Sequence, residues 1–122
     1  LCVGIRLSAD SVRAEGVAGL LADEGVDYLS LALGDSSTYL GSVGIVPPPP
    51  VPEAAVAPAT AGFAVGVPRI ATSRIRDVEV ADRLLAEGVA DAVGMTRALI
   101  ADPDFPRKAR DGQPHEILRC IG

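Results

Sequence analysis

Two arginines occupy positions where phosphate chemistry is expected. Arg74 follows a short apolar run at residues 67–72, and Arg97 follows a second one at residues 90–95. A helical pattern separates the runs, so both are interpreted as parallel strands joined by one helix, with their following loops on one edge of a sheet. Two such loops with small residues and arginines, beside the start of a short helix, favour a phosphate site.

The segment between the two arginines has helix signals at both ends. Asp77 is a suitable N-cap, and Gly88 suits the position just past the last helical turn. The apolar residues behind the cap recur at helical spacing: Val78, Ala81, Leu84 and Leu85. Thr96 and Arg97 then open a further helical turn.

The first third of the chain shows the same rhythm of strand and helix. Residues 1–7 are predicted to form a buried strand, residues 12–25 a helix, residues 26–33 a strand, and residues 34–44 a series of turns. Arg6 interrupts the first strand near its C-terminal end. A charge there must face a polar opening or pair with a neighbouring carboxylate.

Residues 45–58 are rich in proline and are called the proline-rich insert. Four successive prolines at 47–50 predict an extended polyproline path and exclude a helix or central strand. We interpret the insert as a long loop on the functional face rather than a linker between domains, because strand–helix units continue on both sides. A short helix is expected within residues 59–66.

The C-terminal part is expected to be helical and solvated. Asp102 and Pro103 are predicted to cap and open a charged helix that stops at Gly112. Residues 115–121 are predicted to form one more helical turn that carries Cys120, and His115 is expected on the surface.

Four consecutive strand–helix units fit an α/β fold, namely part of a (β/α)8 TIM barrel. The 122 residues are too few for a whole barrel, which needs roughly 200 or more. The chain begins with Leu1 and ends with Gly122, so we expect a fragment of a longer protein. An open doubly wound sheet would show the same periodicity, although the lack of a GxGxxG motif weakens a dinucleotide-binding version of it.

Composition narrows the possible partners. The net charge of −5 and the pI of about 4.7 argue against nucleic acid and anionic membranes as partners. No apolar run approaches the ~18 residues of a membrane span. Two distant cysteines make no disulfide framework, so a reducing, cytoplasmic location is expected. Cys2 lies on a predicted strand and is expected to pack in the core.

Several segments resemble the Old Yellow Enzyme family. They are VGIRLS, GVDYLSLALG, PRIATSRIRD, GVADAVGMTRALIADPDFPRKARDG and the final RCIG. More narrowly, they resemble its long branch, which includes 2,4-dienoyl-CoA reductases and trimethylamine dehydrogenases. The resemblance covers nearly the whole chain except the proline-rich insert. It implies the C-terminal half of an FMN-binding TIM barrel, about strands 5–8 with their helices, spanning residues 1–122.

The resemblance also implies flavin-binding positions. Arg6 matches the arginine at the flavin pyrimidine edge, where a fixed cation stabilises the reduced ring. Ser73 and Arg74 match the loop whose backbone amides hold the FMN phosphate, with Ser73 in place of the usual glycine. The second phosphate loop is matched by Gly94, Met95, Thr96 and Arg97.

Further cofactors are implied for a longer protein. Cys120 resembles the first cysteine of a motif that holds a 4Fe–4S cluster, so residues 120–122 would begin an iron–sulfur segment. A cluster takes four thiolates, and Cys120 is the one cysteine of this motif in the sequence. FAD in a downstream domain and NAD(P)H as electron donor are also implied. The family's catalytic acid and substrate-binding pair lie upstream, so no catalytic residue is assigned; Tyr39 is expected to pack under its own loop.

Three functional readings follow from the sequence. The first is part of an FMN-dependent NAD(P)H oxidoreductase that acts on a small-molecule substrate, as an ene-reductase does. The second is part of a phosphate-binding barrel enzyme without flavin, and Arg6 argues against it. The third is an inactive half-barrel that pairs with its missing half or with itself, because its outer strand edges would be open.

Overall fold

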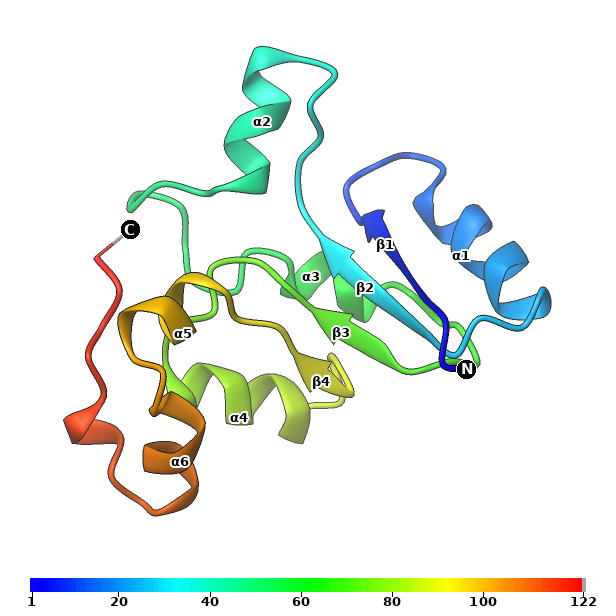
Figure 1. Ribbon diagram of the computed structural model, residues 1–122. Coiled ribbons are helices and arrows are strands. Elements are labelled where there is room, and N and C mark those ends of the chain that lie inside the picture. Colours follow the sequence, from blue (N-terminus) through cyan, green and yellow to red (C-terminus); the bar gives the residue numbers. More distant parts are fainter. Residues whose placement is uncertain (122) are drawn as a thin grey trace.

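The computed structural model describes residues 1–121, and its centre is a sheet of four parallel strands (Figure 1). The strands are β1 (Gly4–Ser8), β2 (Tyr28–Ala32), β3 (Arg69–Ala71) and β4 (Ala92–Val93). They lie side by side in chain order, and each neighbouring pair is parallel. Sequential parallel strands joined by helices are the arrangement of a barrel segment, so the predicted α/β partial barrel is confirmed.

Six α-helices and one short 3₁₀ helix connect and follow the strands within residues 1–121. Their bounds are α1 (Ala14–Asp23), α2 (Tyr39–Ile45), α3 (Ala57–Ala61), α4 (Val78–Ala86), α5 (Arg97–Ala101), α6 (Phe105–Arg110) and η1 (Pro114–Glu116). Helix α1 packs on β1, α3 on β3 and α4 on β4. None of these helices combines the length and the apolar character that crossing a membrane requires.

The strand register separates the two faces of the sheet. Arg6 pairs with Ser30, which pairs with Ile70, so these side chains share one face. Leu29 and Leu31 lie on the opposite face and are fully buried. The core therefore lies between that face and the helices, while Arg6 lies on the face away from the core.

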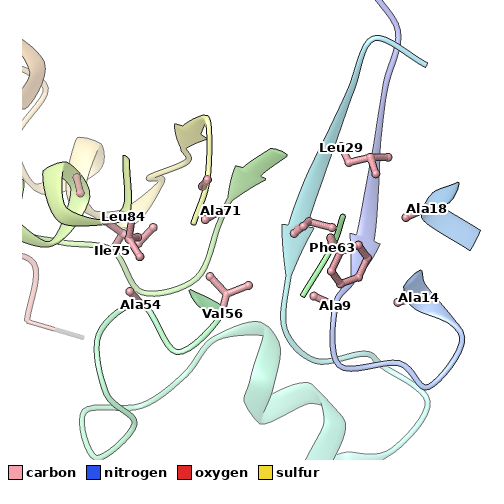
Figure 2. Packing of buried hydrophobic residues seen from close by; sticks show 13 residues of the cluster. Ala9, Ala14, Ala18, Leu29, Ala54, Val56, Phe63, Ala71, Ile75 and Leu84 are labelled. Atoms are coloured by element: carbon pink, nitrogen blue, oxygen red, sulfur yellow. The ribbon is translucent and has the colours of Figure 1, made fainter. Parts of the chain in front are cut away.

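The buried cluster joins segments that are distant in the chain (Figure 2). Ala14 and Ala18 come from α1, Leu84 comes from α4, and Ala54 and Val56 come from the proline-rich insert. All are at most 5% exposed. The insert is thus part of the core, as expected for a loop of this domain and not for a linker.

Helix α4 begins and ends where its capping residues predict. The Asp77 carboxylate accepts a hydrogen bond from the Glu79 amide at 2.9 Å, which satisfies a free donor of the first turn. Gly88 follows the helix with φ +67°, a left-handed conformation that glycine adopts at low cost. Gly25 and Gly112 end α1 and α6 in the same conformation.

The segment 34–44 corrects one prediction, because it contains helix α2. Thr38 caps this helix by accepting a hydrogen bond from the Gly41 amide at 2.9 Å. Gly34 and Gly44 touch closely enough that a Cβ on Gly44 would lie 2.8 Å from the Gly34 Cα. The glycines that suggested turns instead permit this close approach. Tyr39 is 88% exposed, so its expected packing under the loop is wrong.

Burial near the N-terminus also differs from expectation. Strand β1 is only half-buried, with Arg6 exposed, and Cys2 is exposed and not a core residue. In α1, Ala14 and Ala18 are buried, whereas Leu20 is 68% exposed and Val12, before the helix, is fully exposed. The physical reason is that β1 pairs with one strand only in the described chain.

The C-terminal helices have different bounds from those predicted. Helix α6 starts at Phe105 with Asp104 at its N-cap, and Asp102 serves a different purpose described below. The expected helical turn at 115–121 is wrong: η1 ends at Glu116, and Cys120 lies in irregular chain. His115 is exposed, as predicted. Gly122 of the expected iron–sulfur segment lies outside the described residues.

The proline run makes a turn instead of one uninterrupted extended path. The Val51 amide donates to the Pro48 carbonyl at 3.0 Å and closes the turn. Pro47 is fully buried, and its carbonyl accepts a hydrogen bond from Arg74 in the loop after β3 at 3.2 Å.

Candidate functional site

The ends of the strands converge on a cavity of about 450 Å³. Its lining comprises Arg6, Ile45, Val46, Thr72, Ser73, Arg74, Ile75, Arg76, Gly94, Met95, Thr96, Arg97 and Ala98. All seven residues predicted for the flavin site are in this set. The structure therefore brings together residues that span more than ninety positions in the chain.

The loop after β3 and the loop after β4 form adjacent walls of the cavity. Main-chain bonds continue the sheet into these loops: the Thr72 amide donates to Leu31 at 2.8 Å, and the Gly94 amide donates to Ala71 at 2.9 Å. The Thr72 hydroxyl also donates to the Leu31 carbonyl at 2.9 Å. These bonds fix where each loop leaves its strand.

Gly94 is required by the close approach of the two loops. A Cβ at this position would lie 2.3 Å from Cγ2 of Thr72. Thr72 is β-branched, and its hydroxyl is engaged with the Leu31 carbonyl, so it has little freedom to move. The glycine therefore serves packing between the loops and not a left-handed backbone.

The left-handed residue of the loop after β3 is Arg74, with φ +47°. Ser73, the residue that stands where the resembling family has glycine, does not have this conformation. Few residues other than glycine adopt positive φ, and such backbone is held by the surrounding structure. Here the Ala54 amide donates to the Arg74 carbonyl at 3.3 Å, and the Arg74 Nη1 donates to the Pro47 carbonyl at 3.2 Å.

Four arginines line the cavity, and they differ in their partners. Arg74 and Arg76 bind other parts of the chain. Within residues 1–121, the side chains of Arg6 and Arg97 have neither a hydrogen bond nor an ion pair. The carboxylate partner considered for Arg6 is therefore not found in the described chain. None of the described lining residues is acidic, so the cavity is cationic in a chain of net charge −5.

Two buried polar atoms in the loop after β3 lack partners among the described residues. They are the hydroxyl of Ser73 and the Nε of Arg74. Ser73 is 9% exposed and Arg74 is 8% exposed. Leaving such groups without a hydrogen bond is costly, so they mark a place where an acceptor from outside the chain would be stabilised.

A smaller cavity of about 270 Å³ adjoins this site, because Arg6 and Ile45 line both. Its other lining residues are the last residues of β1 and β2 and the start of the loop that follows β2: Leu7, Ser8, Ala32, Leu33 and Gly34. There the Asp10 carboxylate accepts from the Gly34 amide at 3.0 Å, and the Ser8 hydroxyl donates to Asp10 at 2.8 Å. These bonds hold the two loops beside Arg6.

Asp102 organises the C-terminal segment through several hydrogen bonds. Asp102 is 3% exposed and accepts hydrogen bonds from Lys108 at 2.7 Å, from the Leu118 amide at 2.9 Å and from the Asp104 amide at 3.1 Å. The Lys108 ammonium group, followed by these amides, lowers the pKa of Asp102 from its ordinary value. Sequence analysis interpreted Asp102 as a helix cap and missed this role, because Leu118 is sixteen residues away.

Arg76 is a second residue that sequence analysis did not single out. Its Nη1 donates to the Cys120 carbonyl at 2.9 Å, and its Nε donates to the Glu53 carboxylate at 2.9 Å. One guanidinium group thus joins the proline-rich insert to the segment that carries Cys120. The local sequence around Arg76 could not indicate these partners, because Glu53 and Cys120 are 23 and 44 positions away.

Comparison with known proteins identifies relatives of this chain. Residues 60–116 match the model of the NADH:flavin oxidoreductase / NADH oxidase family. A metal reductase of Desulforamulus reducens is 49% identical over 59 residues, which are 48% of this chain and 9% of that protein. An N,N-dimethylglycine/sarcosine dehydrogenase of Chromohalobacter salexigens is 30% identical over 98% of this chain and 19% of its own length.

The fold is shared with a solved structure. The 6-hydroxypseudooxynicotine amine oxidase of Pseudomonas geniculata superposes with a TM-score of 0.84, over 99% of this chain and 19% of that one, at 22% identity. The chain thus spans less than a fifth of the length of these relatives. The family match and the shared fold confirm the resemblance found in the sequence: the chain belongs to the NADH:flavin oxidoreductase / NADH oxidase family, which includes the Old Yellow Enzymes.

Proposed function

We propose that this cavity binds FMN in the full-length protein, and that the protein is an NAD(P)H-dependent oxidoreductase of the ene-reductase or dienoyl-CoA reductase type. The observation that carries the proposal is the meeting of Arg6, Arg74 and Arg97 at one cavity without an acidic lining residue in the described chain. A phosphate group with its two negative charges suits such a site, because arginine matches phosphate geometry through paired donors.

The residues present fit the phosphate end of FMN. The Ser73 hydroxyl and the Arg74 Nε have no partner among the described residues, and both can donate hydrogen bonds to phosphate oxygens. Arg97 opens helix α5 at the same cavity and has no partner among the described residues. We assign the phosphate to Ser73, Arg74, Arg97 and the loop Gly94–Thr96, with charge-assisted hydrogen bonds as the main attraction.

Arg6 is assigned to the pyrimidine edge of the flavin ring. Arg6 lies on β1 at one edge of the sheet, and Arg97 follows β4 at the other edge. The two arginines can therefore contact different parts of one ligand, and they need not both bind the same small anion. When bound, the flavin supplies hydride transfer between NAD(P)H and an electrophilic small molecule. The Arg6 cation would favour negative charge on the reduced ring.

An iron–sulfur cluster is proposed only if Cys120 is joined by further ligands from outside this chain. Within residues 1–121, no group of three or more His, Cys, Asp or Glu side chains could hold a metal ion. Cys120 can therefore serve as one thiolate of four, in a chain that continues the iron–sulfur segment at 120–122. A downstream FAD domain and a cytoplasmic location belong to the same proposal.

We further propose that the sheet pairs with the rest of its barrel. In the described chain β1 pairs only with β2 and β4 only with β3, so each has an open edge. Val3, Leu40 and Val46 are examples of large apolar residues that remain exposed. Expressed alone, residues 1–122 are expected to be inactive and to associate with themselves.

The proposal is tested on the full-length protein. It should purify with FMN, and anaerobic NADH or NADPH should bleach the absorbance of the oxidised flavin. A protein that stays colourless after incubation with FMN but binds sugar or nucleotide phosphates would contradict the flavin assignment and support a phosphate-binding barrel without flavin.

A further inference from the structure

Arg76 lines the cationic cavity with Arg6, Arg74 and Arg97, yet its surroundings differ from theirs. Its side chain is 21% exposed, and the Glu53 side chain beside it is 30% exposed. Nε donates to Glu53 Oε1 at 2.9 Å, and Nη2 donates to the same oxygen. The charge of this arginine is therefore neutralised within the chain, whereas those of Arg6 and Arg97 are not.

The remaining face of the Arg76 guanidinium binds the main chain of the C-terminal segment. Nη1 donates to the Cys120 carbonyl at 2.9 Å, across 44 positions of sequence. Nε, Nη1 and Nη2 all have partners, so this group has fewer free donors for a bound anion than Arg97 has. A guanidinium group that already donates to two protein acceptors must break those hydrogen bonds before it can donate to a ligand.

The two segments joined by Arg76 have other anchors that point to the same arrangement. The proline-rich insert is also held by Arg74 through the Pro47 carbonyl at 3.2 Å. The C-terminal segment is also held by Asp102 through the Leu118 amide at 2.9 Å and by Asp77 through Arg119 at 2.6 Å. Arg76 is the residue among these that binds both segments and lines the cavity.

We propose that Arg76 is a positioning residue: with Glu53 it holds residues 117–121 and the proline-rich insert against the wall of the cavity, and it does not itself bind the anion. The inference rests on the proposed function for the identity of the ligand. Its physical basis is independent of that ligand, because a guanidinium paired with a carboxylate and a carbonyl restrains three chain segments at once.

The test compares Arg76→Met and Glu53→Gln in the full-length protein, with Arg107→Met as the matched control. Arg107 is an exposed arginine paired with Asp104 and lies outside the cavity lining. The first readout is amide hydrogen exchange at residues 117–121 in protein stripped of flavin. Both variants should lose protection there by roughly tenfold, the order expected for one hydrogen bond to a charged group, and the control should match the wild type.

The second readout is the dissociation constant for FMN. A positioning role and a direct anion contact predict opposite changes in this constant for Glu53→Gln. A positioning role predicts that both variants weaken FMN slightly and in the same direction, because both loosen the same wall. A direct anion contact predicts that Arg76→Met weakens FMN at least tenfold while Glu53→Gln strengthens it, because a competing negative charge is removed.

The outcomes separate the two proposals. Unchanged exchange at 117–121 in both variants, or opposite effects on FMN, would overturn the positioning role. If the wild-type protein does not bind FMN at all, the proposed function fails, and the exchange measurement still decides the role of Arg76. Should Arg76→Met not fold, Glu53→Gln carries the same exchange prediction.

Discussion

Arg6 and Arg97 line the same cavity, although Arg6 lies on β1 at one edge of the sheet and Arg97 follows β4 at the other. Parallel strands make this possible, because their C-terminal ends share one edge and the loops that follow them meet there. Arg6 faces away from the core, which brings its charge to the cavity without burying it among apolar side chains.

Adding a methyl group at Gly94 should disturb the contact between the loops after β3 and β4. Gly94→Ala places a Cβ 2.3 Å from Cγ2 of Thr72, so one of the loops must shift. Overpacking of this kind costs about 1–3 kcal/mol, and the melting temperature and FMN affinity of the full-length protein should both fall. Gly66→Ala is the control, since no atom lies within 4 Å of its Cβ. Equal melting temperatures for the two variants would show that the loops are not in close contact.

Removing the N-cap of α4 should destabilise the unit that carries the phosphate loops. Asp77→Ala deletes the acceptor for the Glu79 amide and the partner of Arg119. Loss of an N-cap costs about 1 kcal/mol, measured as a lower midpoint in urea unfolding. Asp77→Asn keeps a capping oxygen and should recover most of the loss, whereas equal destabilisation by Ala and Asn would assign the effect to Arg119.

Asp102 should make stability depend on pH in the acid range. Its pKa in the folded chain is below the ordinary value of 3.8, chiefly because of Lys108. Between the two values the folded protein binds fewer protons than the unfolded chain, so its stability increases with pH there. The contribution is complete above pH 3.8 and is lost as the pH falls toward the lowered value.

The measurement is the melting temperature of the full-length protein from pH 7 down to pH 3, for the wild type and Asp102→Asn. The variant should be less stable at neutral pH, and the difference between the proteins should narrow as the wild-type carboxylate becomes protonated. A constant difference across this range would contradict the role of the Asp102 charge.

The sequence predicted the parts of the fold that local signals determine. Helix α4 has a capping aspartate, apolar residues at helical spacing and a terminal glycine within twelve positions, and all three act in the structure. The residues that the family resemblance assigns to a flavin site line one cavity, because parallel strands bring the loops that follow them to one edge.

The features that were missed depend on contacts between distant residues. Helix α2 arises in a glycine-rich segment that reads as turns, and it is packed where Gly34 and Gly44 meet. The Asp-Pro pattern at Asp102 is typical of a helix cap, whereas its contact with the Leu118 amide joins residues sixteen positions apart. The partners of Arg76 are 23 and 44 positions away, beyond any periodic pattern.

The central claim is that the arginines divide the ligand between them, with Arg97 at the phosphate and Arg6 at the ring. The most direct test is the affinity of the full-length protein for FMN and for riboflavin, which lacks the phosphate, in the wild type, Arg97→Ala and Arg6→Ala. Arg97→Ala should weaken FMN by at least about tenfold, the effect of losing one charge-assisted contact, and leave riboflavin nearly unchanged. Arg6→Ala should weaken both ligands equally. If Arg97→Ala weakens riboflavin as much as FMN, or changes neither affinity, the phosphate assignment is contradicted.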